Sequence, residues 1–193
     1  MKKIPFTLVL VLCLSFCLYY SCRQKSNRDE QADRFRAHAA FLDSLKNALY
    51  YNSDEGEYFR FHDGRFMLDT TYIFKTKTIR YVLQMSVGDV LIEHDFDHDS
   101  VTDALLPLTA NGGGSGIFVG VAVMLNKNAT ALYSDSKWLG DRIKIDSAAM
   151  VGDTVCVYSI VQGPDEPMCC PTMPYIFKLF YKDSKLELFN ERP

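Results

Sequence analysis

The chain has 193 residues, which suits one domain preceded by an export signal. Its residues are 48% hydrophobic and 23% charged, a composition that supplies a hydrophobic core and argues against wholesale disorder. Without residues 1–21, which carry Lys2 and Lys3, the chain has 19 basic and 24 acidic residues, so its net charge is about −5 with His neutral. Nucleic-acid binding needs a stripe of basic residues that neutralises phosphates. The negative net charge of this chain argues against nucleic-acid binding and gives no support for docking on anionic lipid.

The first 22 residues have the three parts of a secretory signal. Lys2 and Lys3 form a basic start, residues 4–20 are almost wholly apolar, and Ser21-Cys22 follows before the chain turns polar. An uncleaved membrane anchor is the alternative interpretation. Its apolar run of 17 residues is short of the ~20 that span a bilayer, and basic residues follow it on the side that would have to cross.

A signal that ends in a small residue followed by Cys resembles the bacterial lipoprotein signal. The resemblance implies that the thiol of Cys22 takes a diacylglycerol and that the chain is cut just before it, after a signal peptide of residues 1–21. We then expect a lipidated tether over residues 22–28 and a single domain over residues 29–193, attached to the membrane of the cell envelope. Arg23 is not an Asp-type inner-membrane retention signal, which favours the outer membrane in a cell with two membranes.

Residues 28–50 are predicted to form one amphipathic helix. Apolar side chains recur there at helical spacing, while charged side chains fall mostly on other faces. The apolar positions are Phe35, Ala39, Leu42, Leu45 and Leu49. We expect this stripe to pack on the domain rather than on a membrane, because the lipid already supplies attachment.

After Asn52 the hydrophobic period changes from 3.6 to 2, which indicates β-strands. Residues 57–62 and 65–68 flank Asp63-Gly64, a pattern that predicts a hairpin with a two-residue turn. In that register Phe61 faces Phe66 and Phe59 faces Leu68.

The remaining strands complete the predicted fold class. They cover residues 72–85, 88–94, 103–109, 117–125, 142–149, 153–162, 174–182 and 185–190. Residues 117–125 are apolar except for Gly120, which predicts a central strand covered on both faces, and residues 182–185 predict a hairpin turn. The expected class is α+β, with an N-terminal amphipathic helix packed on a large, mainly antiparallel β-sheet.

An acidic segment at residues 94–103 is the richest candidate site. Its carboxylates, Asp95, Asp97, Asp99 and Asp103, stand at relative positions 1, 3, 5 and 9, and the carbonyl of Val101 falls at position 7. Calcium takes six to eight hard oxygen ligands, which a tight acidic loop provides. The segment resembles the DxDxDGxxD loops of integrin-type and dockerin-like modules, with Ser100 in place of Gly. A solvated acidic turn without metal is one alternative, and a transition metal on His94 and His98 is another.

The glycine-rich segment 111–116 has little support as a functional site. It lacks the Lys-Ser/Thr of a phosphate loop, and a strand rather than a helix follows it. Ser115 lacks the strand-turn-helix setting of a nucleophile elbow. A flexible hairpin connection is the expected structure.

Adjacent cysteines lie in a proline-rich loop over residues 163–172. If residues 153–162 pair with residues 174–182, Cys156 lies opposite residue 178, too far down the ladder to reach the loop. We therefore predict that Cys156 is a buried, free thiol and that Cys169 and Cys170 form a vicinal disulfide in an oxidising envelope. A loop that folds back to pair Cys156 with one of them is the alternative. Cys-x-x-Cys, the usual redox motif, is absent.

The order of these motifs resembles small bacterial lipoproteins similar to the LppP/LprE lipoprotein family. The resemblance covers residues 90–182, and its most specific parts are Leu139-Gly-Asp-Arg142 and the Asp-x-Pro-x-Cys-Cys-Pro run that begins at Asp165. It implies an envelope location and a shared fold, and it supplies no catalytic residues.

We therefore expect a lipid-anchored envelope protein whose β domain is a non-enzymatic binding or structural module, stabilised by Ca²⁺. Its partners would be the membrane, through the lipid on Cys22, and a protein or small ligand that the sequence does not identify. The alternative is a metal-dependent envelope hydrolase that uses the acidic and histidine side chains of residues 94–103.

Metabolic labelling with a palmitate analogue tests the lipidation of Cys22. The wild-type chain is expected to take the label and Cys22→Ala is expected to remain unlabelled, because the thiol is the acceptor atom. Equal labelling of the two chains on a gel of isolated membranes would contradict the assignment.

Overall fold

The computed structural model describes residues 28–52, 56–167 and 169–189. The predicted signal peptide, the predicted lipidation site Cys22 and most of the predicted tether lie outside these residues. The chain divides into two units, Met1–Ala40 and Phe41–Pro193. A helix over residues 28–45 crosses the boundary between the units, and all the strands of the described part belong to the second unit.

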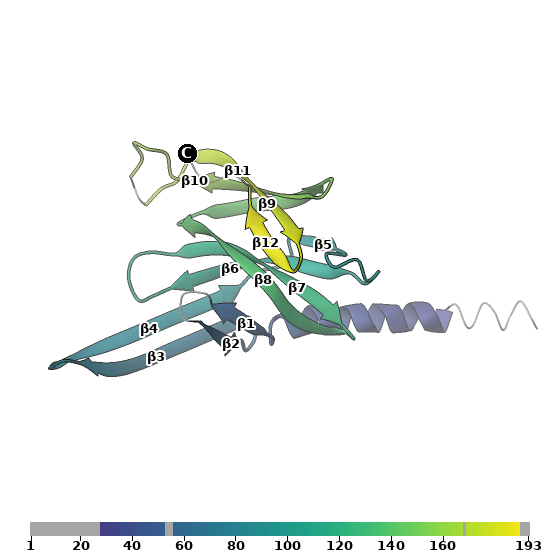
Figure 1. The fold of residues 1–193 in the computed structure, drawn as a ribbon, viewed down its shortest axis with the longest axis horizontal. Helices are drawn as coiled ribbons and strands as arrows, with labels where there is room; N and C mark the ends of the chain where they lie inside the picture. Colours follow the sequence, from purple (N-terminus) through teal and green to yellow (C-terminus); the bar gives the residue numbers. More distant parts are fainter. Residues whose placement is uncertain (1–27, 53–55, 168, 190–193) are drawn as a thin grey trace, which may run out of the picture. The chain divides into compact units, whose positions relative to one another are not determined.

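The second unit is built from antiparallel strands (Figure 1). In chain order they are β1 (Leu49–Asn52), β2 (Glu57–Arg60), β3 (Arg65–Phe74), β4 (Lys77–Val87), β5 (Ile92–His94), β6 (Asp103–Asn111), β7 (Phe118–Lys127), β8 (Thr130–Asp141), β9 (Lys144–Val151), β10 (Thr154–Val161), β11 (Met173–Lys182) and β12 (Lys185–Leu188).

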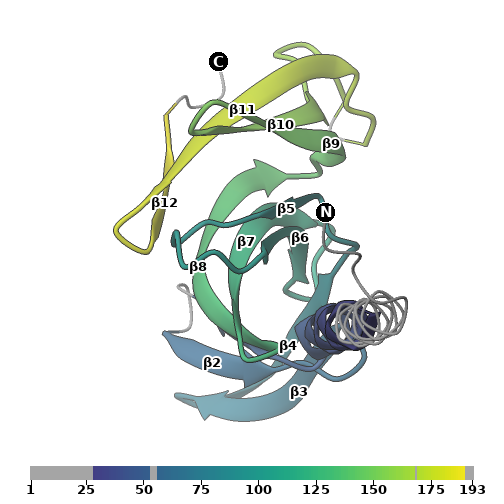
Figure 2. The same ribbon diagram turned by 90° about the vertical axis from the view of Figure 1, so that its right-hand side faces the viewer.

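These strands form three sheets in the described part of the chain (Figure 2). The central sheet has the order β3-β4-β6-β7-β8, with β5 paired to β6. A four-stranded sheet has the order β12-β11-β10-β9, and β1 pairs with β2. Most neighbours in the sheets are also neighbours in the chain, because short turns join antiparallel strands.

Strand β7 separates two hydrophobic cores. Its residues Val119, Val121 and Val123 face the C-terminal core, which the four-stranded sheet closes with side chains such as Val157 and Phe177. The alternate residues Ala122 and Met124 face the N-terminal core, where they meet residues of β1, β2, β4 and the helix end. The expected central strand, covered on both faces, is confirmed at this position.

The predicted fold class, α+β with the helix packed on a large sheet, is wrong. The structure is mostly β-sheet with one short helix. Phe35 is 72% exposed and Ala39 is exposed, whereas Phe41 and Leu45 are buried in the N-terminal core. The helix contributes only its last turn to that core, so its apolar spacing is a poor guide to its packing.

The helix ends at residue 45 rather than at the predicted residue 50. The hydroxyl of buried Tyr50 donates a 2.7 Å hydrogen bond to the carbonyl oxygen of Leu45, which satisfies one of the carbonyls left at a helix end. Leu49 begins β1 instead, and its apolar side chain belongs to a strand.

The predicted hairpin at residues 57–68 is correct at its turn and wrong in its pairing. Asp63 and Gly64 have φ values of 49° and 74°, as a two-residue turn of this kind requires, and His62 bridges Arg65. Beyond the turn, β2 pairs with β1, and β3 pairs with β4. The Phe59 ring therefore stacks on Phe66, with centroids 4.4 Å apart, and does not face Leu68 across a ladder.

The C-terminal hairpins were predicted more accurately. Cys156 lies opposite Lys178, as expected, and Lys182 pairs with Lys185 across a two-residue turn. The whole of β8 was missed. Two register shifts against β7 interrupt its alternation, so no clean period of two is present in its sequence.

Within residues 28–52, 56–167 and 169–189, no helix combines the length and apolarity needed to cross a bilayer.

Gly120 lies where β8 bulges toward β7, and the close approach explains the break in an otherwise apolar run. A Cβ atom there would lie 2.6 Å from the carbonyl oxygen of Lys137 and 2.9 Å from the Trp138 ring.

Gly120→Ala is expected to lower the free energy of unfolding by about 1–3 kcal/mol, because the backbone of β8 must move. Gly112→Ala is the matched control, since nothing lies within 4 Å of its added Cβ. Equal urea midpoints for the two variants would contradict this packing.

Candidate functional site

The acidic loop of residues 95–102 connects β5 to β6 and is folded by its own carboxylates. Asp95 accepts hydrogen bonds from the backbone N–H groups of Asp99, at 3.0 Å, and Ser100, at 2.9 Å. Asp99 in turn accepts one from the N–H of Val101, at 2.9 Å. His98 and Ser100 have φ values of 60° and 67°, so Ser100 adopts the left-handed conformation that glycine favours.

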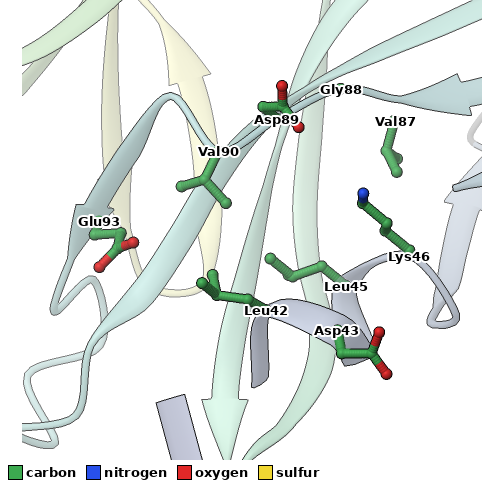
Figure 3. Close-up of a pocket in the computed structure, with 9 residues that line it drawn as sticks. All are labelled: Leu42, Asp43, Leu45, Lys46, Val87, Gly88, Asp89, Val90 and Glu93. Atoms are coloured by element: carbon green, nitrogen blue, oxygen red, sulfur yellow. The ribbon is translucent and has the colours of Figure 1, made fainter. Parts of the chain in front are cut away.

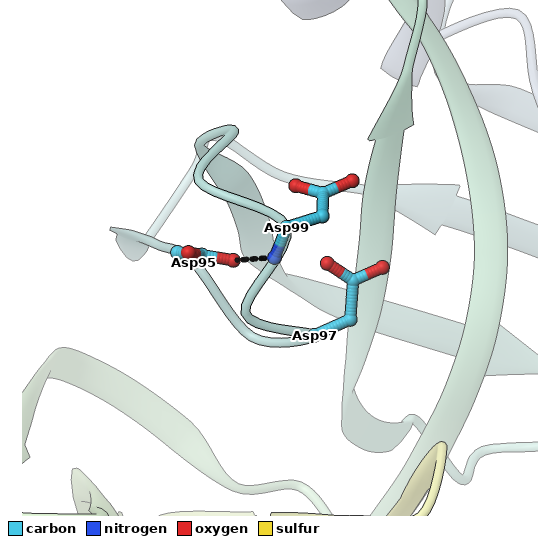
Figure 4. Close-up of side chains that lie close together, drawn as sticks. All are labelled: Asp95, Asp97 and Asp99. Atoms are coloured by element: carbon cyan, nitrogen blue, oxygen red, sulfur yellow. Dashed lines mark hydrogen bonds between the residues drawn. The ribbon is translucent and has the colours of Figure 1, made fainter.

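Three of the four predicted acidic ligands converge. One oxygen each from Asp95, Asp97 and Asp99 lies within 4.8 Å of the others (Figure 4). Figure 4 shows Asp97 and Asp99 extending their carboxylates in the same direction, with Asp95 across the loop. Carboxylates this close repel one another unless a cation lies among them.

A lysine supplies a positive charge to this group. The Nζ atom of Lys127, at the end of β7, lies 2.5 Å from an oxygen of Asp97 and 2.5 Å from an oxygen of Asp99. Its hydrogen bond lowers the pKa of Asp99, and the two carboxylates raise the pKa of Lys127. The second oxygen of Asp97 is buried and has no hydrogen-bond partner among the described residues. The charge of the loop is therefore only partly compensated.

Asp103 anchors the loop instead of joining the group. Its side chain is fully buried, and its oxygens accept hydrogen bonds from the backbone N–H groups of Phe96, at 2.9 Å, and Asn126, at 2.8 Å. Burial raises the pKa of Asp103, while the backbone donors oppose that shift. Asp103 thus ties the start of the loop to the end of β7, and no carboxylate oxygen of it belongs to the converging group.

The two histidines lie outside the carboxylate group as well. The His94 ring packs edge-on against Phe96, with centroids 5.2 Å apart. His94 and His98 line a separate cavity of about 490 Å³ together with Asp153 and Glu187 of the C-terminal sheet region. Among the described residues the carboxylates of residues 95–99 form the one group suited to a metal, and it contains no imidazole. The geometry gives no support to a transition-metal centre built on this loop.

Lys127 and Asn126 are the site residues that sequence reasoning missed. They follow an apolar run and precede a turn, which is an ordinary place for polar residues. Their role becomes visible only from the pairing of β6 with β7, where Ala104 lies opposite Met124. Continuing that register places Lys127 beside Val101, so the missing signal is the strand pairing and not the composition.

A second cavity of about 390 Å³ lies beside the helix end (Figure 3). Leu42, Leu45 and Val90 form apolar parts of its wall. The charged side chains of its lining are Lys46 and three carboxylates, Asp43, Asp89 and Glu93. This mixed lining favours no class of ligand, and we assign no function to it.

The glycine-rich segment is the hairpin connection between β6 and β7, as expected, and side-chain hydrogen bonds hold it at both ends. The amide nitrogen of Asn111 donates to the carbonyl oxygens of Gly114 and Gly116, and Asp141 accepts from the N–H of Ile117 at 2.8 Å. Arg142 bonds both Asp141 and the Ser115 carbonyl. The Leu139–Arg142 motif therefore has a structural role, which is to fasten this turn to the end of β8.

A glutamate closes the cysteine loop. The carboxylate of Glu166 accepts hydrogen bonds from the backbone N–H groups of Gly163 and Thr172 and from the Thr172 hydroxyl, and these bonds lower its pKa. The loop is thus closed at its base without help from a cysteine.

The two adjacent cysteines lie at the exposed end of that loop. The Sγ atoms of Cys169 and Cys170 are 2.6 Å apart, and the hydrogen bond between them raises the pKa of Cys170. Cys156 is buried within β10, five residues before the last paired residue, Val161. At about 3.3 Å per residue it lies far beyond disulfide reach of the loop.

No protein-family model matches the chain, and no curated protein or solved structure matches it either. The resemblance to the LppP/LprE lipoprotein family therefore stays a prediction from the sequence.

Peptide mapping without reduction tests the cysteine assignment. In the mature chain, recovered under oxidising conditions with free thiols blocked, Cys169 and Cys170 are expected in one peptide that is lighter by two hydrogens, and Cys156 is expected to carry the blocking group. The reason is that β10 holds Cys156 away from the loop. A crosslink between the Cys156 peptide and the loop would contradict the register.

Proposed function

We propose that this chain is a lipid-anchored protein of the cell envelope whose β domain acts by binding or structural support rather than by catalysis, with its acidic loop as a calcium site. The attachment part rests on the sequence of residues 1–22, which lie outside the described residues. The calcium part rests on the geometry of the loop. An unidentified protein or small ligand would be the partner of the domain.

The observation that carries the calcium site is the negative charge of Asp95, Asp97 and Asp99, which Lys127 compensates only in part. Three carboxylates converge on one point, and a buried oxygen of Asp97 has no donor among the described residues. Leaving a buried carboxylate oxygen unpaired is costly. A hard cation with water molecules in its remaining positions would satisfy that oxygen and remove the repulsion between the carboxylates.

Lys127 and calcium would compete for the same oxygens. The lysine ammonium satisfies one oxygen of Asp97 and one of Asp99, but it provides a single charge against three. Its side chain is 39% exposed, so it can leave the carboxylates for solvent when a divalent ion enters. This exchange predicts a weaker site than a loop without the lysine would have, and one whose strength depends on residue 127.

Thermal melts with calcium and with chelator test the site. Calcium at about 100 times its Kd would stabilise the wild-type chain by roughly 2.7 kcal/mol, which for a domain of this size raises Tm by roughly 5–10 °C. Lys127→Met is expected to melt lower than wild type in chelator, because the carboxylates lose their internal cation. The same variant is expected to show the larger calcium-induced rise, because nothing competes with the ion.

Lys144→Met is the matched control, because Lys144 also pairs with an aspartate, at 2.7 Å from Asp146, on a strand away from the loop. It should keep the wild-type response to calcium. If the Tm of wild type and the Tm of Lys127→Met are each the same with calcium as with chelator, the loop is a bare acidic turn without a calcium site. Zinc-dependent turnover of a panel of simple esters would contradict the non-catalytic role.

A further inference from the structure

The hairpin of β3 and β4 extends beyond the rest of the central sheet as a two-stranded arm. We define the arm as residues 70–81, from the pair Thr70 and Tyr81 to the pair Phe74 and Lys77. Strand β6 pairs with β4 only over residues 84–87, so in the described part of the chain neither edge of the arm has a neighbouring strand. Figure 1 shows the two strands running out past the body of the second unit. Five residues per strand give a reach of roughly 17 Å.

The tip of the arm is apolar on both of its faces. Tyr72 and Phe74 are 50% and 58% exposed and share the face that carries Phe66 and Leu68 toward the N-terminal core. Ile73 points to the opposite face and is 76% exposed. A protein partner docked on the sheet would cover one face of the arm. Apolar side chains exposed on both faces of the tip are instead suited to a tip that is surrounded by lipid on all sides.

The arm is also basic, although the chain as a whole is acidic. Residues 70–81 contain Lys75, Lys77 and Arg80 and no acidic residue. Arg80 is paired with Asp69 at the base of the arm, while Lys75 lies over the ring of Phe74, 5.6 Å from its centroid. The net positive charge is thus concentrated beside the apolar tip, where it complements an anionic surface.

We propose that the tip of this arm inserts into the interface of a bilayer that contains anionic lipid. Ile73 and Phe74 would enter the boundary between headgroups and acyl chains, Tyr72 would lie at headgroup level, and Lys75 and Lys77 would contact lipid phosphates. Because no strand lies beside either edge of the described arm, its outward backbone groups need water, which confines the insertion to the interface. The proposal rests on the proposed envelope attachment, which would place the chain at a bilayer.

Tryptophan fluorescence in vesicles tests the insertion. The full chain, purified in detergent and reconstituted, is compared with Phe74→Trp in vesicles of phosphatidylglycerol and phosphatidylcholine, some with brominated acyl chains. The parent reports Trp138 alone. The Phe74→Trp chain is expected to show an additional blue-shifted emission that brominated lipid quenches. Phe189→Trp is the matched control, since Phe189 is 72% exposed and lies outside the arm, and its added emission is expected to resist quenching.

Charge variants test the anionic lipid. Lys75→Ser/Lys77→Ser in the Phe74→Trp chain should shift the ratio of inserted to free tip about tenfold or more toward free. Vesicles of pure phosphatidylcholine should shift the ratio in the same direction for the Phe74→Trp chain that keeps both lysines. Equal quenching with and without phosphatidylglycerol would overturn the anionic part. No quenching at residue 74 would overturn the insertion. An emission shift that depends on protein concentration in lipid-free detergent would also overturn it and would indicate that the tip contacts a second copy of the chain.

The same measurement is made on Cys22→Ala without signal cleavage, because residues 4–20 keep that chain at the bilayer by their own apolarity. Quenching in the Cys22→Ala chain, together with a wild-type chain that takes no palmitate label, would support insertion of the arm and reject the lipid anchor. A wild-type chain that is labelled at Cys22 but shows no quenching at residue 74 would support the lipid anchor and reject the insertion.

Discussion

The burial of β7 on both faces is the constraint on which the rest of the structure depends. Alternate residues of this strand enter different hydrophobic cores, so the two cores share a single backbone and neither is complete without it. Full burial requires a strand whose residues are small or apolar at every position, and it leaves no tolerance for a register slip. Gly120 is the place where that requirement is strictest, because the paired strand β8 bulges close to it there.

The acidic loop depends on the same strand through its C-terminal end. Asp103 receives the N–H of Asn126, and Lys127 reaches two carboxylates of the loop. The core therefore fixes the position of the loop, and the loop carries its charge at the surface, where an ion can reach it. A buried carboxylate with two backbone donors is a strong anchor, because removing either donor would leave a buried polar group unpaired.

The sequence predicts well what depends on local pattern. Three features follow from neighbouring residues: the apolar run of β7, interrupted by Gly120, the turn at residues 182–185 and the register of Cys156 against Lys178. The convergence of Asp95, Asp97 and Asp99 follows from their spacing in a tight loop.

Features that depend on distant pairing could not be predicted in this way. Lys127 has no local signal for its place in the site, and the pairing of β2 with β1 competes with an equally plausible hairpin to β3. The bulges that erase the period of β8 result from its contact with β7. The helix shows the converse error, since its apolar spacing continues to Phe35 although only its last turn is buried.

The N-terminal core joins parts of the chain that are synthesised far apart in time. Its helix end includes Phe41, its other wall includes Trp138, and Ser44 accepts a hydrogen bond from the N–H of Ala131, 87 residues later. At about 5–20 residues per second, the early segment waits several seconds for β8 to emerge from the ribosome. It cannot close its core in that interval. If the chain is exported, as we propose, this delay would keep it open enough to be threaded through an export channel before it folds.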